Sequence, residues 1–166
     1  MKYRNGGFRI LQVYDIEIDK RRDFIMEWKY VKKLVDKTCF ENIENTYAIK
    51  LPQCLKDLIL EYNGGRPDKR CFDTKNSKEI VMQGLISYNK DDKGNIYVYD
   101  EILKKGYIPF AITEFGDVIC ININNQNIEL YLHELGDFEF ICNDLNEFIK
   151  DLDKEDLQDF LREKKN

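Results

Sequence analysis

The chain has 166 residues but only one histidine, His133, and its five cysteines are far apart. No two of these residues have the short spacing that zinc sites typically use. His133 follows Leu132 and precedes Glu134, so no serine or cysteine nucleophile is adjacent to it. Because a general base needs partners in a defined geometry, we interpret His133 as a surface or half-buried strand residue. The sequence therefore predicts no catalytic residue, no metal site and no cofactor.

Long apolar runs and an excess of basic residues are also missing. No stretch approaches the ~20 apolar residues that cross a bilayer. No apolar region follows the basic start at residues 1–7, which argues against a signal peptide. The net charge is −5, from 31 acidic and 26 basic residues. Nucleic acids and anionic membranes require a basic face, so we predict neither as a direct partner, whereas a basic protein suits the charge.

The cysteines indicate the redox environment of the protein. They are odd in number and most lie within apolar patterns. They are Cys39, Cys54, Cys71, Cys120 and Cys142. Such residues are typical of buried, reduced thiols in a cytoplasmic protein, and we therefore predict a cytoplasmic location without disulfides.

Length and composition predict one ordered domain that spans residues 1–166. Hydrophobic residues make up 43% of the chain and aromatic residues 13%. This content is too high for a disordered chain, and the length is sufficient to bury a sizeable core.

The segment 107–142 contains the clearest pattern in the sequence. Four apolar runs of strand length alternate with short segments that are rich in glycine, asparagine and aspartate. The runs begin near Ile108, Val118, Ile128 and Phe138. Such spacing predicts a four-stranded antiparallel meander over residues 108–142. One face of the second and third strands is uniformly apolar and the other is mixed, so we expect helices to cover the first face.

Helical periodicity occurs on both sides of the meander. A stripe formed by Phe24, Trp28, Val31 and Val35 predicts a helix that begins at Asp23. Further helices are predicted at residues 41–48, from Pro52 to Asn63, at 95–105, and from Asp144 onward, where a capping box precedes the apolar stripe. Gly64 is expected in the left-handed conformation that ends the second of these helices. Residues 68–78 read as a loop and residues 80–88 as a strand.

Two terminal extensions complete the predicted organisation. Residues 8–18 alternate in polarity and predict a strand, whereas residues 154–164 continue the closing helices after a break near Asp153. The predicted fold class is therefore α+β, with a largely antiparallel mixed sheet covered by helices.

An ordered set of short motifs resembles the SUKH superfamily, which includes the yeast Smi/Knr cell-wall regulators and many bacterial immunity proteins. Leu51-Pro52 opens a helix that ends in Asn63-Gly64-Gly65, and Ile108-Pro109-Phe110 is followed by Gly116-Asp117. Trp28, Tyr62 and Phe148 also match. The resemblance covers residues 28–152 and implies an α+β fold and a binding role. The cationic stretch 66–78 and a strand before Trp28 depart from the family pattern.

The resemblance implies a function as a protein-binding domain. Bacterial members are thought to neutralise secreted polymorphic toxins, often nucleases, so our first hypothesis is a non-enzymatic immunity protein that binds a basic toxin domain stoichiometrically. The alternative is an intracellular regulatory or scaffold module of the Smi/Knr type. Acidic side chains are the candidate contact residues, although mixed charge on an exposed helix is also ordinary. They are Asp117, Glu134, Asp153, Glu155, Asp156 and Asp159.

Overall fold

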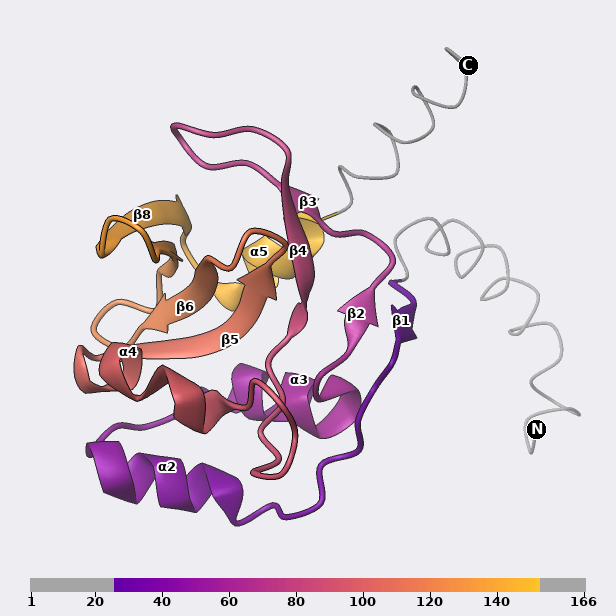
Figure 1. Ribbon diagram of the computed structural model, residues 1–166, viewed down its shortest axis with the longest axis vertical. Helices are drawn as coiled ribbons and strands as arrows, with labels where there is room; N and C mark the ends of the chain where they lie inside the picture. Colours follow the sequence, from indigo (N-terminus) through magenta and orange to yellow (C-terminus); the bar gives the residue numbers. More distant parts are fainter. Residues whose placement is uncertain (1–25, 153–166) are drawn as a thin grey trace, which may run out of the picture.

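A computed structural model describes residues 26–152 of the chain (Figure 1). The predicted strand at residues 8–18 and the predicted helix at 154–164 lie outside these described residues. Within them, helices and antiparallel strands form the α+β architecture that the sequence predicts. Most of the sheet comes from the second half of the described chain, as the colours in Figure 1 show.

The elements follow one another in a simple order. The first half contains β1 (Trp28–Lys29), α2 (Cys39–Tyr47), α3 (Gln53–Tyr62), β2 (Arg66–Pro67), β3 (Cys71–Phe72) and β4 (Ile80–Leu85). The second half contains a 3₁₀ helix, η1 (Ile96–Tyr99), then α4 (Asp100–Lys104), β5 (Tyr107–Thr113), β6 (Val118–Asn122), β7 (Ile128–Leu132), β8 (Asp137–Cys142) and α5 (Leu145–Asp151).

The predicted meander is confirmed and forms the larger part of a six-stranded sheet. The strand order is β3-β4-β5-β6-β7-β8, and each described pair is antiparallel. A separate two-stranded ladder joins β1 to β2. The β5–β6 register shifts between Pro109 and Ala111. Proline lacks a backbone donor, which makes it suitable for such a bulge.

The core lies between the sheet and its helices, because buried side chains come from α2, α3, α4 and α5 as well as from the strands. Helix α5 is behind β5 in Figure 1. Phe110 on β5 is fully buried, and its ring meets Phe148 of α5 edge to face at 5.7 Å. Phe72 contacts the same ring at 5.3 Å. Val118 and Cys120 are also buried, so the central strand β6 is covered on both faces rather than on one.

The helix predicted from Asp23 to Val35 is wrong within the described residues. Trp28 lies in β1, where it pairs with Pro67 and stacks on Tyr62 with ring centroids 4.7 Å apart. After β1 the chain has no regular element before α2, and Leu34 is buried while Val35 is exposed. Strand pairing and aromatic stacking therefore override the helical spacing of the apolar residues.

The other helices agree with the sequence prediction in place but differ in detail. Asn95 accepts a hydrogen bond from Tyr97 N, and η1 then precedes α4, so the predicted helix at 95–105 is two short elements. The capping box before α5 is present, because Asp144 Oδ1 accepts from Glu147 N at 2.8 Å. The short strand β3 lies in the segment that was predicted as a loop.

The cysteines are all free thiols. Cys39, Cys71, Cys120 and Cys142 are buried, as predicted. Cys54 is exposed because its position on α3 faces away from the sheet-covering stripe formed by Leu55 and Ile59.

Candidate functional site: the paired turns of the sheet

Two turns lie side by side at one end of the sheet. The β5–β6 turn follows the Ile112–Val118 pair, and the β7–β8 turn follows the Leu132–Asp137 pair. In a meander of four antiparallel strands, the first and third turns lie at the same end of the sheet. We call the segments 113–117 and 133–136 the paired turns.

Asp117 joins the paired turns to each other. Its Oδ1 accepts a hydrogen bond from the backbone N of His133 at 3.0 Å and lies 2.6 Å from Nδ1 of the His133 ring. The carboxylate thus crosses to the neighbouring turn instead of bonding the backbone of its own turn, as aspartate often does. Asp117 is half-buried, so this predicted contact residue is first of all a structural link.

Thr113 and Gly116 hold the first turn in shape. Buried Thr113 accepts from Asp117 N through Oγ1 at 3.0 Å, and its own N donates to Asp117 O at 2.8 Å. Gly116 has a φ of 90°, a conformation in which other residues are strained. A Cβ atom there would lie 3.6 Å from Cε1 of His133. This role of Thr113 was not predicted, because its side chain reads as an ordinary strand position.

Two large apolar side chains project from the paired turns into solvent. Phe115 is 83% exposed and Leu135 is 72% exposed. Acidic side chains accompany them: Glu114, Asp117, Glu134 and Asp137. Glu134, a predicted contact residue, is exposed, but the apolar tips were not identified from the sequence. The available signal was an apolar residue between a glutamate and a glycine in each turn, where polar residues are usual.

Arginine side chains border the acidic group on one side. Glu114 Oε1 lies 3.3 Å from Arg70 Nη1 and 3.7 Å from Arg66 Nη2. The acidic character of the paired turns therefore ends at Glu114 and passes into a basic region formed around β2.

The buried Asn63 is the centre of the family-like motif. Its Nδ2 donates to Lys32 O at 2.8 Å and to Ser87 Oγ at 3.0 Å, and its Oδ1 accepts from Tyr88 N at 2.7 Å. The backbone O of Asn63 also accepts from Lys32 N at 2.8 Å. One side chain thus fixes the end of α3, the segment after β1 and the segment after β4.

The glycines after Asn63 make this close packing possible. Gly64 has the predicted left-handed φ, at 67°, and Gly65 N donates to Tyr62 O at 2.7 Å. A Cβ on Gly65 would approach Tyr62 O to 2.8 Å and the Trp28 ring to 3.3 Å. The predicted motif residue Pro52 lies at the start of α3, where its carbonyl accepts from Leu55 N and Lys56 N at 3.1 Å each.

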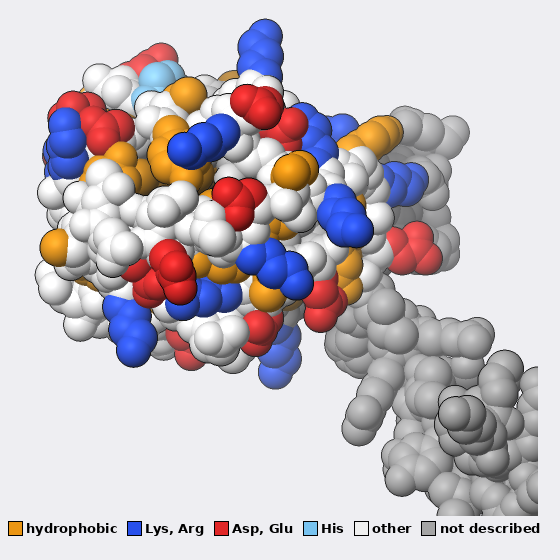
Figure 2. All heavy atoms as spheres, turned by 90° about the horizontal axis from the view of Figure 1, so that it is seen from below, with side chains coloured by type: hydrophobic (Ala, Val, Ile, Leu, Met, Phe, Trp, Pro, Cys, Tyr) orange, Lys and Arg blue, Asp and Glu red, His pale blue; other side chains and the backbone are white. Residues whose placement is uncertain are grey.

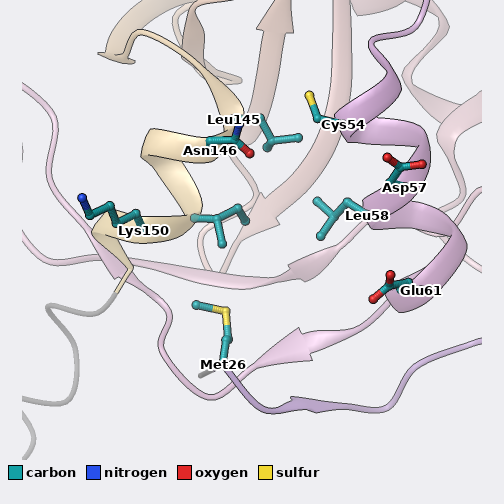
Figure 3. A pocket seen from close by; sticks show the side chains of 9 residues that line it. Met26, Cys54, Asp57, Leu58, Glu61, Leu145, Asn146 and Lys150 are labelled. Atoms are coloured by element: carbon teal, nitrogen blue, oxygen red, sulfur yellow. The ribbon is translucent and has the colours of Figure 1, made fainter. Parts of the chain in front are cut away.

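The surface has a groove between α3 and α5 (Figure 3). Its volume is about 470 Å³, and apolar side chains of Met26, Leu58 and Leu145 point into it. Asp57 and Glu61 lie along the α3 side and Lys150 lies on the α5 side. The exposed thiol of Cys54 lies at one end of the groove.

The remaining predicted contact residues lie outside the described residues: Asp153, Glu155, Asp156 and Asp159. Figure 2 shows the described surface from below, where basic and acidic side chains are interspersed and hydrophobic side chains are scattered. Because acidic and basic side chains are mixed on this face, its charge does not favour a partner of either sign.

No group of three or more histidine, cysteine, aspartate or glutamate residues within residues 26–152 is arranged to hold a metal ion. In the same range, no helix is long and apolar enough to cross a membrane. His133 is exposed on the paired turns, and its hydrogen-bonding partner is a carboxylate from the neighbouring turn. The absence of catalysis and of a cofactor stays a prediction.

The fold and the paired turns define a small α+β domain with an exposed apolar and acidic surface at one end of its sheet. Residues 35–151 match the model of the SMI1 / KNR4 family (SUKH-1). The chain therefore belongs to this family, as the motifs predicted. No curated protein matches the chain.

Proposed function

We propose that the chain is a non-enzymatic immunity protein, which binds a basic, nuclease-type toxin domain in the cytoplasm and occludes its active site or substrate groove. The observation that carries this proposal is the set of exposed side chains on the paired turns. Phe115 and Leu135 extend from hydrogen-bonded turns and are bordered by carboxylates. Membership of the SUKH family supports a role in binding.

The paired turns have the properties of a protein-docking surface. Interfaces derive most of their binding free energy from a few large apolar or aromatic anchors near the centre, and charged groups surround them. The turns are already held by Thr113, Asp117 and His133, so less conformational entropy is lost when a partner binds. The acidic border gives complementarity to a basic partner and accelerates association.

Capture of the partner is the first experiment. A tagged full-length chain is recovered from the cell that produces it, and the bound protein is identified by mass spectrometry. The proposal expects one basic toxin domain in a 1:1 complex whose activity is inhibited at stoichiometric amounts. An inhibited toxin without a stable complex, or a partner that is acidic, would contradict it.

Substitutions then test the surface on the purified complex. Phe115→Ala together with Leu135→Ala should weaken binding by ~30-fold or more, because two anchors of ~1–2 kcal/mol each are lost. The matched control is Val98→Ala, another exposed apolar side chain outside the paired turns, which should change the affinity less than twofold. Equal effects of the two variants would remove the paired turns from the interface.

The second candidate function is a regulatory or scaffold module of the Smi/Knr type. The observation that favours it is the mixture of surfaces around Glu114, where acidic turns adjoin basic side chains. Recovery of several unrelated partners, without a toxin encoded beside the chain, would support this function over immunity.

A further inference from the structure

A cleft beside the paired turns has the opposite charge to them. Its volume is about 540 Å³, and it lies among the segment after β1, strands β2 and β4, and the loop 89–94. Lysine and arginine side chains from three separate segments line it: Lys32, Arg66 and Lys93. The acidic lining residue is Glu114. We call this hollow the cationic cleft.

The cationic cleft is built from segments that are firmly connected. Asn63 holds the backbone of Lys32 by two hydrogen bonds, one from its side chain and one to its carbonyl. Asn89 joins the loop 89–94 to the segment after β1, because its Oδ1 accepts from Val35 N and its Nδ2 donates to Lys33 O. The positions of the cationic backbone segments are therefore fixed before any ligand binds.

Glycines bring two of these walls into close contact. A Cβ on Gly84 would lie 3.1 Å from Gly65 O, and Leu85 N donates to that same carbonyl at 2.8 Å. Strand β4 therefore packs directly on the turn that precedes Arg66. Side chains larger than hydrogen would separate these walls and reshape the cleft.

Arg66 is only loosely engaged within the protein. Its Nη2 lies 3.7 Å from Glu114 Oε1, which is longer than a hydrogen bond. Its buried Nε has no hydrogen-bond acceptor among residues 26–152. The Arg66 side chain is 39% exposed, so its terminal Nη groups, rather than the buried Nε, retain capacity for the paired hydrogen bonds that arginine forms with a carboxylate.

We propose that the cationic cleft binds an acidic peptide segment of a partner protein. Three cations against one carboxylate form a local positive region on a chain whose net charge is −5, and this region attracts carboxylates. The cations come from separate segments around an open hollow, which suits several carboxylates along a chain better than one compact anion. Tyr30, whose side chain is 72% exposed, lies at the cleft and adds an apolar contact.

This inference goes beyond the proposed function, because it adds a site for acidic segments next to the surface for a basic partner. It also gives a role to one residue of the cationic stretch 66–78 that departs from the family pattern. Arg66 from this stretch lines the cleft, whereas Arg70 pairs with Glu114 and limits the repulsion that this carboxylate would exert on an acidic ligand.

A binding assay with the full-length chain tests the proposal. The probe is a fluorescein-labelled peptide of about 12 residues in which glutamate alternates with serine around a central leucine. Its control is the same peptide with glutamine at each glutamate position. Fluorescence anisotropy at low ionic strength should show binding of the glutamate peptide at least ~10-fold tighter than the glutamine peptide. Equal affinities, or no binding of either, would overturn the proposal.

Charge-matched variants locate the binding. Lys32→Glu with Lys93→Glu should weaken binding of the glutamate peptide by ~10-fold or more, since two attractions become repulsions. Lys75→Glu with Lys78→Glu makes the same change in net charge on exposed side chains that do not line the cleft, and should change the affinity less than twofold. Equal losses would indicate non-specific attraction and would refute a site.

Competition separates the peptide from other anions. Inorganic phosphate and a short single-stranded DNA should displace the probe only through their effect on ionic strength, as sodium chloride does. Stronger displacement by either would assign the cleft to phosphate groups and overturn the proposal. Phe115→Ala with Leu135→Ala should leave peptide binding unchanged, so failure of this inference and failure of the proposed function are distinguishable.

Discussion

Single residues differ greatly in how much of the fold depends on them, and Asn63 shows this most clearly. Its side chain satisfies backbone groups of Lys32 and Tyr88 together with the hydroxyl of Ser87, all in a buried position. The sequence identified Asn63 only as part of a helix-ending motif. The spacing of residues in the sequence does not reveal these hydrogen bonds, because the partners of Asn63 are 24 to 31 residues away in the chain.

Asn63→Ala should destabilise the protein by ~2–4 kcal/mol, because it leaves buried backbone groups without hydrogen-bond partners. Urea unfolding followed by circular dichroism measures the change. Asn124→Ala, at an exposed turn position, is the control and should stay within ~0.5 kcal/mol. A loss below ~1 kcal/mol for Asn63→Ala would mean that water replaces these bonds.

Phe110→Ala should cost ~3–5 kcal/mol, since the fully buried ring packs on Phe148 and its removal leaves a cavity. Phe115→Ala removes the same atoms from an exposed turn and should change the stability by no more than ~0.5 kcal/mol. The two variants are compared in the same denaturant titration. The burial of Phe110 was predictable from its place in the apolar run of β5, in which residues 108–111 are all buried.

At the scale of elements, the alternation of apolar runs with turn-forming segments was the pattern from which structure could best be predicted. Strands β5 to β8 were predicted with their turns, because each apolar run ends at residues that tolerate tight turns. The structure around Trp28 was not predicted, because it depends on pairing with Arg66 and Pro67, which are far along the chain. The helical spacing of apolar residues in that segment does not correspond to a helix.

The loop 89–94 should contribute a pH-dependent part of the stability. Hydrogen bonds from Ser87 Oγ, at 2.6 Å, and Asn89 lower the pKa of Asp92. A carboxyl whose pKa is lower in the folded state stabilises the protein fully above its unfolded pKa of ~3.9, and this contribution is lost as the pH falls through the folded pKa.

Asp92→Asn should therefore destabilise the protein at neutral pH, and the difference from the wild type should disappear as the pH falls through the lowered, folded-state pKa of Asp92. Thermal unfolding across the acidic range measures the difference in Tm. Asp91→Asn, at the exposed neighbouring position, should follow the wild-type curve at every pH. A constant offset between Asp92→Asn and the wild type would show that the carboxylate charge is not what stabilises the loop.

At the scale of the whole molecule, different parts of the surface carry different charge. The paired turns are acidic, the cationic cleft adjoins them at Glu114, and the face in Figure 2 is mixed. The net charge of −5 was known from composition, but its arrangement depends on which turns the sheet brings together. Of the predicted contact residues, Asp117 and Glu134 are both placed on the paired turns.

Glu134→Lys with Asp137→Lys should slow association with a basic partner by ~10-fold at low salt, and the difference should shrink as ionic strength rises. Stopped-flow measurements against ionic strength test this, and Tm should stay nearly unchanged because both side chains are exposed. Glu41→Lys with Asp91→Lys is the charge-matched control away from the turns. An equal effect of this control would assign the steering to net charge alone.

The way in which the paired turns are anchored has an evolutionary consequence. Thr113, Asp117 and the backbone of His133 hold the turns, while the tips Phe115 and Leu135 make no contribution to the buried core. Replacements at the tips should therefore change the free energy of unfolding very little. Such a scaffold can exchange one recognition sequence for another and acquire a new partner while its stability is conserved.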